Sequence, residues 1–397
     1  MAVTSGCTNP LFPTNEEFKK AVKEYISQEC STNSGCAIGQ TYGYPIGKWL
    51  TTCITDMSFL FAGFEENHIV NEVLFDEDIS EWDVSSVLNM EFMFYLAPSF
   101  NQPLNNWDVS SVSNFGNMFR KASSFNRTLN DWDVSSATNL GFMFNGASSF
   151  NQPLNNWGVS SVSRFHRMFE EASSFNQPLN GWNVGSARDM HQMFIHATSF
   201  NQPLNDWDVS SATDMMYMFG GASKFNQPLS NWDVSSVSNF GAMFGGASSF
   251  NQPLNDWDVS SATSLATMFA GATSFDQPLN SWEFGIVGFK VNSMFQGASS
   301  FNQPLNDWDV SSVFDFGAMF AHAISFNQPL TDWNVGSADM NNMFIGASSF
   351  NQNLCTWAAN SATFPYGERS SKMFGETSCT NKADPTSAAK GPLCADC

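Results

Sequence analysis

Large apolar residues recur along this chain at a fixed interval, so the hydrophobic pattern itself is a repeat. Trp107, Trp132 and Trp157 are each 25 residues apart, and the residues around them keep the same interval. All 13 tryptophans fall in this register, which predicts about 13 stacked coils with irregular ends. In such an array each unit buries its core only against its neighbours, so a long chain can form one continuous array.

Each copy begins with a segment that has the pattern of a short β-strand. Leu104, Trp107 and Val109 are separated by polar residues, and Trp107 and Val109 fall on the same side of an extended chain. This is the Leu-x-x-Leu-x-Leu spacing of leucine-rich repeat strands. We expect a parallel sheet along the array, with the Trp column in the core rather than exposed as a carbohydrate-stacking strip.

The second segment of each copy has the pattern of a short helix. Phe115, Met118, Phe119 and Ala122 follow the i, i+3, i+4, i+7 spacing of one helical face. Serines precede them, as N-cap residues do, and frequent glycines limit the length to about two α or 3₁₀ turns. The predicted fold class is therefore an α/β repeat solenoid similar to leucine-rich repeats, each coil a short parallel strand plus a short helix.

The two ends of the chain depart from the repeat. An amphipathic pattern over residues 15–26 predicts a helix that covers the first coil. We expect an N-terminal helical cap over residues 1–45, the solenoid over 46–374, and a C-terminal cap or tail over 375–397 that runs back over the last coil.

Cysteines are confined to these ends, four at each, which predicts disulfide-stapled caps and an oxidising compartment. Every bridge should lie within its own end group, with Cys355–Cys379 the preferred C-terminal pair. A zinc site at each end is the alternative. The candidates are Cys7, Cys30, Cys36, Cys53, Cys355, Cys379, Cys394 and Cys397.

The net charge of the chain disfavours some classes of function. The formal net charge of −21 disfavours binding to nucleic acid or anionic lipid, and no apolar run is long enough to span a membrane. The chain shown begins without a signal-peptide pattern. Because disulfides imply an oxidising compartment, we expect an extracellular or cell-surface protein whose signal peptide has been trimmed.

An acidic column follows the tryptophans, and we expect its side chains to point outward. Each Asp is expected to accept bonds from the amides of the Ser-Ser pair that follows, closing an Asx turn and capping the helix. Calcium shared between coils is the alternative, with Asp208, Asp233 and Asp258 as ligands.

An Asn column, exemplified by Asn101 and Asn151, is expected to form an internal ladder that satisfies turn amides. Asn126-Arg127-Thr128 replaces the usual Asn-Gln-Pro and forms the only Asn-x-Ser/Thr sequence. If Asn126 is buried in the ladder, glycosylation there is blocked.

The positions around the Met-Phe pair vary between copies, unlike the Trp segment. Two histidines lie there, a coil apart, but without a carboxylate partner they make a poor metal site. Neutral drift of a solvated face would explain the variation; a recognition patch for an acidic glycan or a partner protein is the functional interpretation. Its candidate residues are Phe142, His166, Arg167, His191, Gln192 and Tyr217, with Arg120, Lys121, Arg164, Arg188 and His196 nearby.

The copy from Phe200 to Ala222, which reads FNQPLNDWDVSSATDMMYMFGGA, resembles the BspA-like leucine-rich repeat surface proteins. It is most similar to the 25-residue repeat class first named for mycoplasma lipoproteins and abundant in microalgae. The resemblance covers nearly the whole chain and implies a repeat architecture associated with surface adhesion.

That resemblance implies no catalytic motif, and the sequence contains no nucleophile elbow, metal-binding His motif or phosphate-binding loop. We therefore expect a non-enzymatic binding or adhesion module without a cofactor, whose partner is a protein or a glycan. A structural or material-binding solenoid, contacting ice, mineral or fibres through regular polar ladders, is the alternative.

Overall fold

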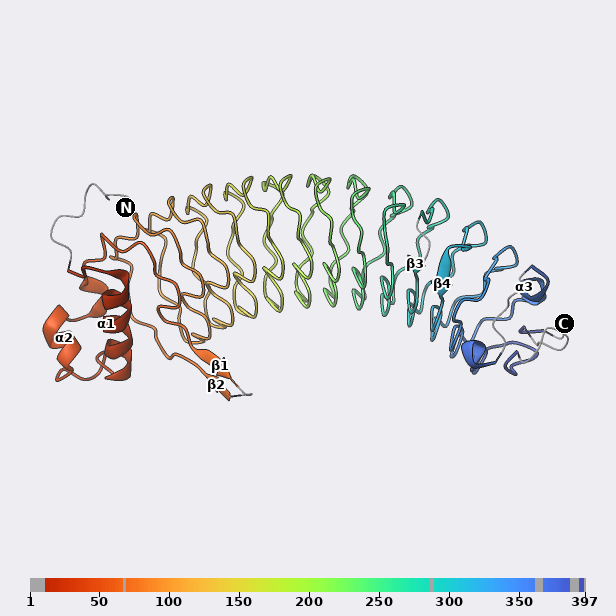
Figure 1. Ribbon diagram of the computed structural model, residues 1–397, viewed down its shortest axis with the longest axis horizontal. Helices are drawn as coiled ribbons and strands as arrows, with labels where there is room; N and C mark the ends of the chain where they lie inside the picture. The colour runs from red at the N-terminus through yellow and green to blue at the C-terminus, as the bar shows by residue number, and fades with distance from the viewer. Residues whose placement is uncertain (1–10, 67–68, 286–288, 361–366, 386–392, 396–397) are drawn as a thin grey trace. The chain divides into compact units, whose positions relative to one another are not determined.

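The computed structural model describes residues 11–66, 69–285, 289–360, 367–385 and 393–395. The chain divides into two compact units, residues 1–187 and 188–397. Within each unit the repeats form a stack of coils (Figure 1), and bridges such as Asn114 to Asn139 link residues one repeat apart. The repeat solenoid predicted from the tryptophan spacing is therefore present within each unit.

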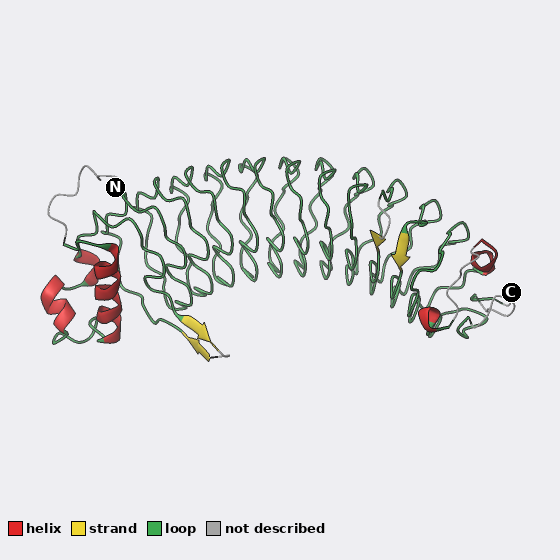
Figure 2. Cartoon of the chain, in the orientation of Figure 1, coloured by secondary structure: helices red, strands yellow, loops and turns green. Residues whose placement is uncertain are grey.

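Regular helices and strands are few in the described residues, and the coils are drawn almost entirely as loops and turns (Figure 2). Strands β1 (Phe64–Glu66) and β2 (Ile69–Asn71) pair antiparallel, and β3 (Phe289–Lys290) pairs with β4 (Val313–Asp315) in parallel. No described helix is both long enough and apolar enough to cross a membrane. The elements of the first unit are α1 (Asn15–Ser27), α2 (Ala37–Tyr42), η1 (Ile46–Lys48), β1 (Phe64–Glu66) and β2 (Ile69–Asn71). Those of the second unit are β3 (Phe289–Lys290), β4 (Val313–Asp315), α3 (Cys355–Asn360) and η2 (Glu368–Ser370).

The helix predicted around the Met-Phe pair is not formed in the described coils; a chain of tight turns takes its place. Phe115 donates its backbone N–H to Asn139 of the next coil at 3.1 Å, and Met118 donates back to Phe115 at 3.1 Å. Asn117 and Lys121 have left-handed backbones, with φ of 59° and 61°. Backbone N–H groups thus alternate between a turn bond and a bond to the neighbouring coil, so they cannot form the i to i−4 ladder of an α-helix.

The predicted strand at the Trp segment is also absent, since a turn replaces it. Trp107 donates its backbone N–H to Leu104 at 3.1 Å, and the indole N–H of Trp132 donates to the same carbonyl at 2.9 Å. The Leu104 carbonyl is satisfied by these two bonds and needs no sheet partner. The coil-to-coil backbone ladder lies instead along the Met-Phe segment.

The core prediction for the Trp column is confirmed. Trp132 is 3% exposed, and its ring stacks on Trp107 at a centroid distance of 6.4 Å. Phe119 stacks in the same way between Phe94 at 5.4 Å and Phe144 at 5.6 Å. Rings buried on all sides have no partner for a hydroxyl group, which explains the preference for Phe over Tyr.

The N-terminal end carries the expected amphipathic helix. Thr14 caps α1 by accepting from the Glu17 amide at 3.1 Å. On its buried face, Phe18 lies 5.4 Å from the Trp82 ring, and Tyr25 lies 5.5 Å from Trp49. The helix therefore covers the apolar surface that the first coils would otherwise expose.

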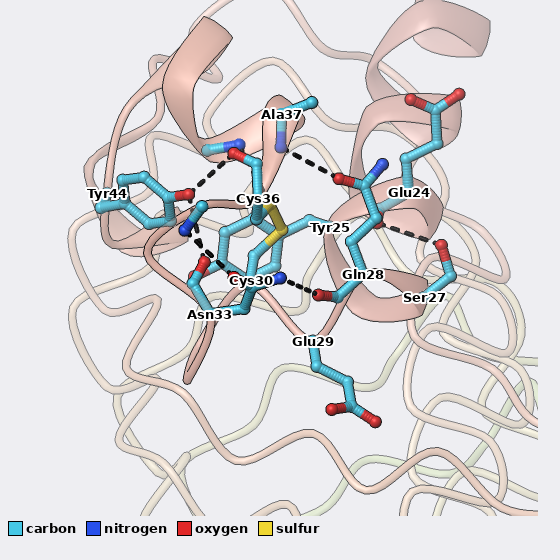
Figure 3. The surroundings of a disulfide bond; sticks show 12 residues. Glu24, Tyr25, Ser27, Gln28, Glu29, Cys30, Asn33, Cys36, Ala37 and Tyr44 are labelled. Atoms are coloured by element: carbon cyan, nitrogen blue, oxygen red, sulfur yellow. Dashed lines mark hydrogen bonds between the residues drawn. A yellow bond between two sulfur atoms is a disulfide. The ribbon is translucent and has the colours of Figure 1, made fainter.

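A disulfide joins Cys30 to Cys36 beside this helix (Figure 3). The loop it closes is held from outside as well: the Tyr44 hydroxyl donates to the Cys36 carbonyl at 2.8 Å, and the Ala37 amide donates to Gln28 Oε1 at 3.1 Å. These bonds make the disulfide part of an ordered cap.

At the C-terminal end the predicted Cys355–Cys379 pair is wrong, because Cys379 bonds to Cys394. The chain folds back after Cys379, and Asn381 forms an antiparallel bridge to Cys394, which places the two Cα atoms 4.7 Å apart. The described end of the tail contacts the last coil, since Leu354 donates its amide to Leu393 at 3.1 Å. Cys53 and Cys355 are also disulfide-bonded, whereas Cys7 and Cys397 lie outside the described residues.

Candidate binding surface

The residue before each Met-Phe pair, or before Leu60-Phe61 in the first coil, adopts a left-handed backbone in every described copy. We call this position the variable column; its φ angles lie between 52° and 59°. A residue with a Cβ costs about 1–2 kcal/mol in this conformation. In the first unit the column consists of Phe59, Phe92, Asn117, Phe142 and Arg167. In the second unit it consists of Gln192, Tyr217, Ala242, Thr267, Ser293, Ala318, Asn342 and Lys372.

Glycine is the residue that relieves this strain, and a neighbouring column shows that the fold can use it. Four residues further along each coil, a second left-handed position is filled by glycine in several copies, such as Gly146 and Gly221. The variable column holds no glycine in any described copy and retains rings and a guanidinium group instead. Its side chains are therefore kept in spite of the backbone strain they carry.

In the first unit these side chains join into a continuous strip. The Phe59 and Phe92 rings stack at 4.6 Å, and Tyr95 meets Phe92 edge-on at 5.4 Å. The Arg120 guanidinium then lies 5.3 Å from the Tyr95 ring centroid and 5.0 Å from that of Phe142. Both separations are within the range of cation–π attraction.

Arg167 continues the alternation, 5.3 Å from the Phe142 ring. We call these side chains the aromatic–arginine strip. It remains accessible at its ends, because Phe59 is 49% exposed and the Arg167 side chain is 36% exposed. The strip consists of Phe59, Phe92, Tyr95, Arg120, Phe142 and Arg167.

A hydrogen bond holds the Arg120 guanidinium group and an ion pair holds that of Arg167. Arg120 donates from Nε to Asn145 Oδ1 at 3.2 Å, an amide oxygen that carries no net charge. Arg167 lies 3.7 Å from the Glu170 carboxylate. Its buried Nε has no hydrogen-bond partner among the described residues, which is uncommon for a buried donor. The strip is thus held in place while keeping positive charge in a strongly acidic chain.

Three of the predicted patch residues come together here. Phe142 contacts both Arg167 and His166, and the His166 ring meets it edge-on at 5.1 Å. His166 packs over Gly141, where an added Cβ would approach its ring to 2.5 Å. Sequence reasoning missed Phe59, Phe92 and Tyr95, although Phe59 and Phe92 could have been found by following the variable column into the first two coils.

The other three predicted residues lie in the second unit. His191 contacts the Asp189 carboxylate through Nδ1, a partner that the sequence interpretation did not anticipate. Gln192 keeps a buried Oε1 without a hydrogen-bond partner among the described residues, and Tyr217 is 39% exposed. Gln192 and Tyr217 occupy consecutive positions of the variable column.

The acidic column beside the tryptophans forms Asx turns, as expected. Asp208 accepts from the Ser210 hydroxyl at 2.6 Å and from its amide at 3.1 Å, and Asp233 and Asp258 bind their own serines in the same way through the amide. The Ser210 hydroxyl, and then its amide, hold the pKa of Asp208 below its ordinary value. These bonds close a turn and cap no helix.

Among the residues that the structure covers, no three His, Cys, Asp or Glu side chains are grouped to hold a metal ion. Calcium at the acidic column remains a prediction.

The Asn column forms the predicted ladder. Asn151 Oδ1 accepts the Asn176 amide at 2.9 Å, and Asn201 Oδ1 accepts the Asn226 amide at 2.9 Å. The Ser and Thr columns bond between coils too, as when Thr138 donates its hydroxyl to Ser113 at 3.3 Å. The regular polar columns that favoured a material-binding role are therefore used for cohesion between coils.

An acidic hollow of about 610 Å³ lies beside α1 and was not anticipated from the sequence. Glu29, Glu72 and Glu77 contribute carboxyl groups to it, beside the apolar side chain of Leu74. Tyr25 donates its hydroxyl to Glu77 at 2.9 Å, yet burial raises the pKa of Glu77 above its ordinary value. The hollow has the charge to accept a cation.

No curated protein is significantly similar to this chain. The sequence matches the family described as "Mycoplasma protein of unknown function, DUF285" over residues 31–153, 127–226, 202–288 and 286–386. The four matches overlap in tandem and cover most of the chain, in keeping with the repeat. The chain therefore belongs to the DUF285 family of repeat proteins.

Proposed function

We propose that this protein is a non-enzymatic binding or adhesion module at the cell surface or outside the cell, and that its aromatic–arginine strip binds acidic glycans. The observation that carries the proposal is the variable column. Its large side chains are retained in left-handed conformations where glycine would be less strained, and in the first unit they alternate with guanidinium groups.

The chemistry of the strip suits an acidic sugar polymer. Aromatic rings offer flat apolar faces to the C–H faces of sugar rings. Guanidinium groups form bidentate bonds with carboxylate or sulfate. Because Phe59 and Phe92 lie on successive coils and Phe142 two coils further on, the strip can follow a linear chain of sugars rather than a single one.

The negative charge of the rest of the molecule supports binding of an acidic glycan at this strip rather than elsewhere on the surface. With a net charge of −21, most of the surface repels a polyanion. Binding of an acidic glycan therefore has to be concentrated where arginines gather. The resemblance to BspA-like leucine-rich repeat surface proteins favours adhesion, and the cap disulfides favour an oxidising compartment.

The test measures binding to immobilised heparin, which carries sulfates and carboxylates, and to polygalacturonate, which carries carboxylates without sulfate. The strip variant combines Phe59→Asn, Phe142→Asn and Arg167→Gln. Asn and Gln already occupy the same column at Asn117 and Gln192, so the backbone can accept them. We expect affinity to fall at least about tenfold, which is about 1.4 kcal/mol.

The matched control carries Ser293→Asn and Ala318→Asn in the same column of the second unit, outside the strip residues, and should bind as the parent does. A third variant changes Asp208, Asp233 and Asp258 to Asn. The proposal fails if the strip variant binds normally while the aspartate variant loses binding. Binding to protein but to neither polysaccharide would assign the strip to a protein partner instead.

A further inference from the structure

One copy of the Asn ladder departs from the usual Asn-Gln-Pro at two exposed positions, Arg127 and Thr128. Asn126, Arg127 and Thr128 are all solvent-exposed, and they replace the usual Asn-Gln-Pro with an Asn-x-Thr sequence. Proline at the third position excludes an N-glycosylation sequence in most copies, and threonine creates one here. Asn126 is not buried in the ladder, so burial does not block glycosylation there.

The bonds of Asn126 leave its amide nitrogen available. Its Oδ1 accepts the Asn151 amide at 3.0 Å and the Gln152 Nε2 group at 3.0 Å. Its backbone N–H donates to Asn101 Oδ1 at 3.0 Å. Among the residues that the structure describes, the exposed side chain takes part in the ladder through its oxygen.

Arg127 preserves the ladder at the position where glutamine is replaced. In the next coil, Gln152 Nε2 reaches back to the preceding Asn; Arg127 Nε reaches back in the same direction, to the Asn101 carbonyl, at 2.7 Å. The sequence can therefore differ from the other copies here without loss of a coil-to-coil bond.

We propose that Asn126 is an N-glycosylation site. Its Nδ2 forms a bond to C1 of the first sugar of a lipid-pyrophosphate-linked oligosaccharide. The C1–oxygen bond to pyrophosphate breaks, lipid pyrophosphate leaves, and the amide gives up one proton. The product keeps its carbonyl oxygen, so the bonds from Asn151 and Gln152 survive. This inference rests on the extracellular location in the proposed function but not on glycan binding.

The experiment secretes the full chain from cultured insect cells behind a cleavable signal peptide. Peptide mass mapping, before and after peptide N-glycosidase treatment, reads the state of position 126. We expect an oligosaccharide that the enzyme removes, leaving Asp at that position. The Cys379–Cys394 bridge, mapped in the same digest, verifies that the secreted chain is folded.

Two variants of Thr128 separate the sequence requirement from folding. Thr128→Pro restores the usual repeat sequence and should abolish modification without loss of secretion, whereas Thr128→Ser should retain it. An unmodified Asn126 in secreted, correctly bridged protein would overturn the inference. That result would leave the strip's binding to heparin and polygalacturonate untouched, so the two proposals are judged separately.

Discussion

At the scale of single residues, different side chains of each repeat have different structural roles. Trp132 fills the core, stacks on its neighbour and satisfies a carbonyl of the preceding coil. The burial of the Trp column could be predicted from spacing alone. The left-handed variable column could not, because sequence periodicity reports which side a residue faces and not the sign of its φ angle.

Replacing Trp132 by Ala should destabilise the fold by about 3–5 kcal/mol, as for other buried aromatic truncations. Trp132→Phe keeps a ring and loses only the indole bond to Leu104, whose carbonyl still accepts the Trp107 amide, so its cost should be smaller. Chemical denaturation measures both. Equal stability of Trp132→Ala and the parent would show that the indole is not in the core.

Ala318→Gly should raise stability by about 0.5–1 kcal/mol. The change relieves about 1–2 kcal/mol of left-handed strain at φ 54°, and about 0.5–1 kcal/mol of that is offset by the freedom glycine gains when unfolded. Ala270→Gly is the control, since Ala270 is not among the left-handed positions, and it should be destabilising. If both variants lose stability, strain at the variable column is negligible.

At the scale of elements, the sequence predicted which residues are buried better than which secondary structure they form. Phe115, Met118, Phe119 and Ala122 are all buried, as the helical spacing required. In the described coils, a series of tight turns with every fourth residue left-handed points the same positions toward the core. The spacing of apolar residues alone therefore does not distinguish such a series of turns from a helix. The strip was only partly predicted, because its aromatic start lies in the irregular first coils.

The contribution of the C-terminal disulfide to stability can be measured by removing it. Cys379→Ala with Cys394→Ala should lower stability by about 3 kcal/mol, as expected for a bridge spanning 15 residues. Removing Cys30–Cys36, which spans 6 residues, should cost less. Urea unfolding of the two double variants compares them, and a larger effect from the shorter loop would contradict this order.

At the scale of the whole molecule, many of the acidic residues that give the chain its negative charge have a structural role. Many aspartates close local turns beside a tryptophan, as Asp108 does with Ser110 at 2.6 Å. A net charge of −21 therefore describes the background surface more than a ligand site. Membership of the DUF285 family agrees with the repeat, and the aromatic–arginine strip is the feature that sets the first unit apart from that regular background.

The central claim is that ligands bind through the variable column of the first unit. Covalent labelling of side chains, in the presence and absence of heparin, tests it most directly. We predict protection of Phe59, Phe92 and Phe142, with labelling of the Asp208 and Asp258 segments unchanged. Protection at those aspartate segments, with the three phenylalanines labelled as before, would contradict the account.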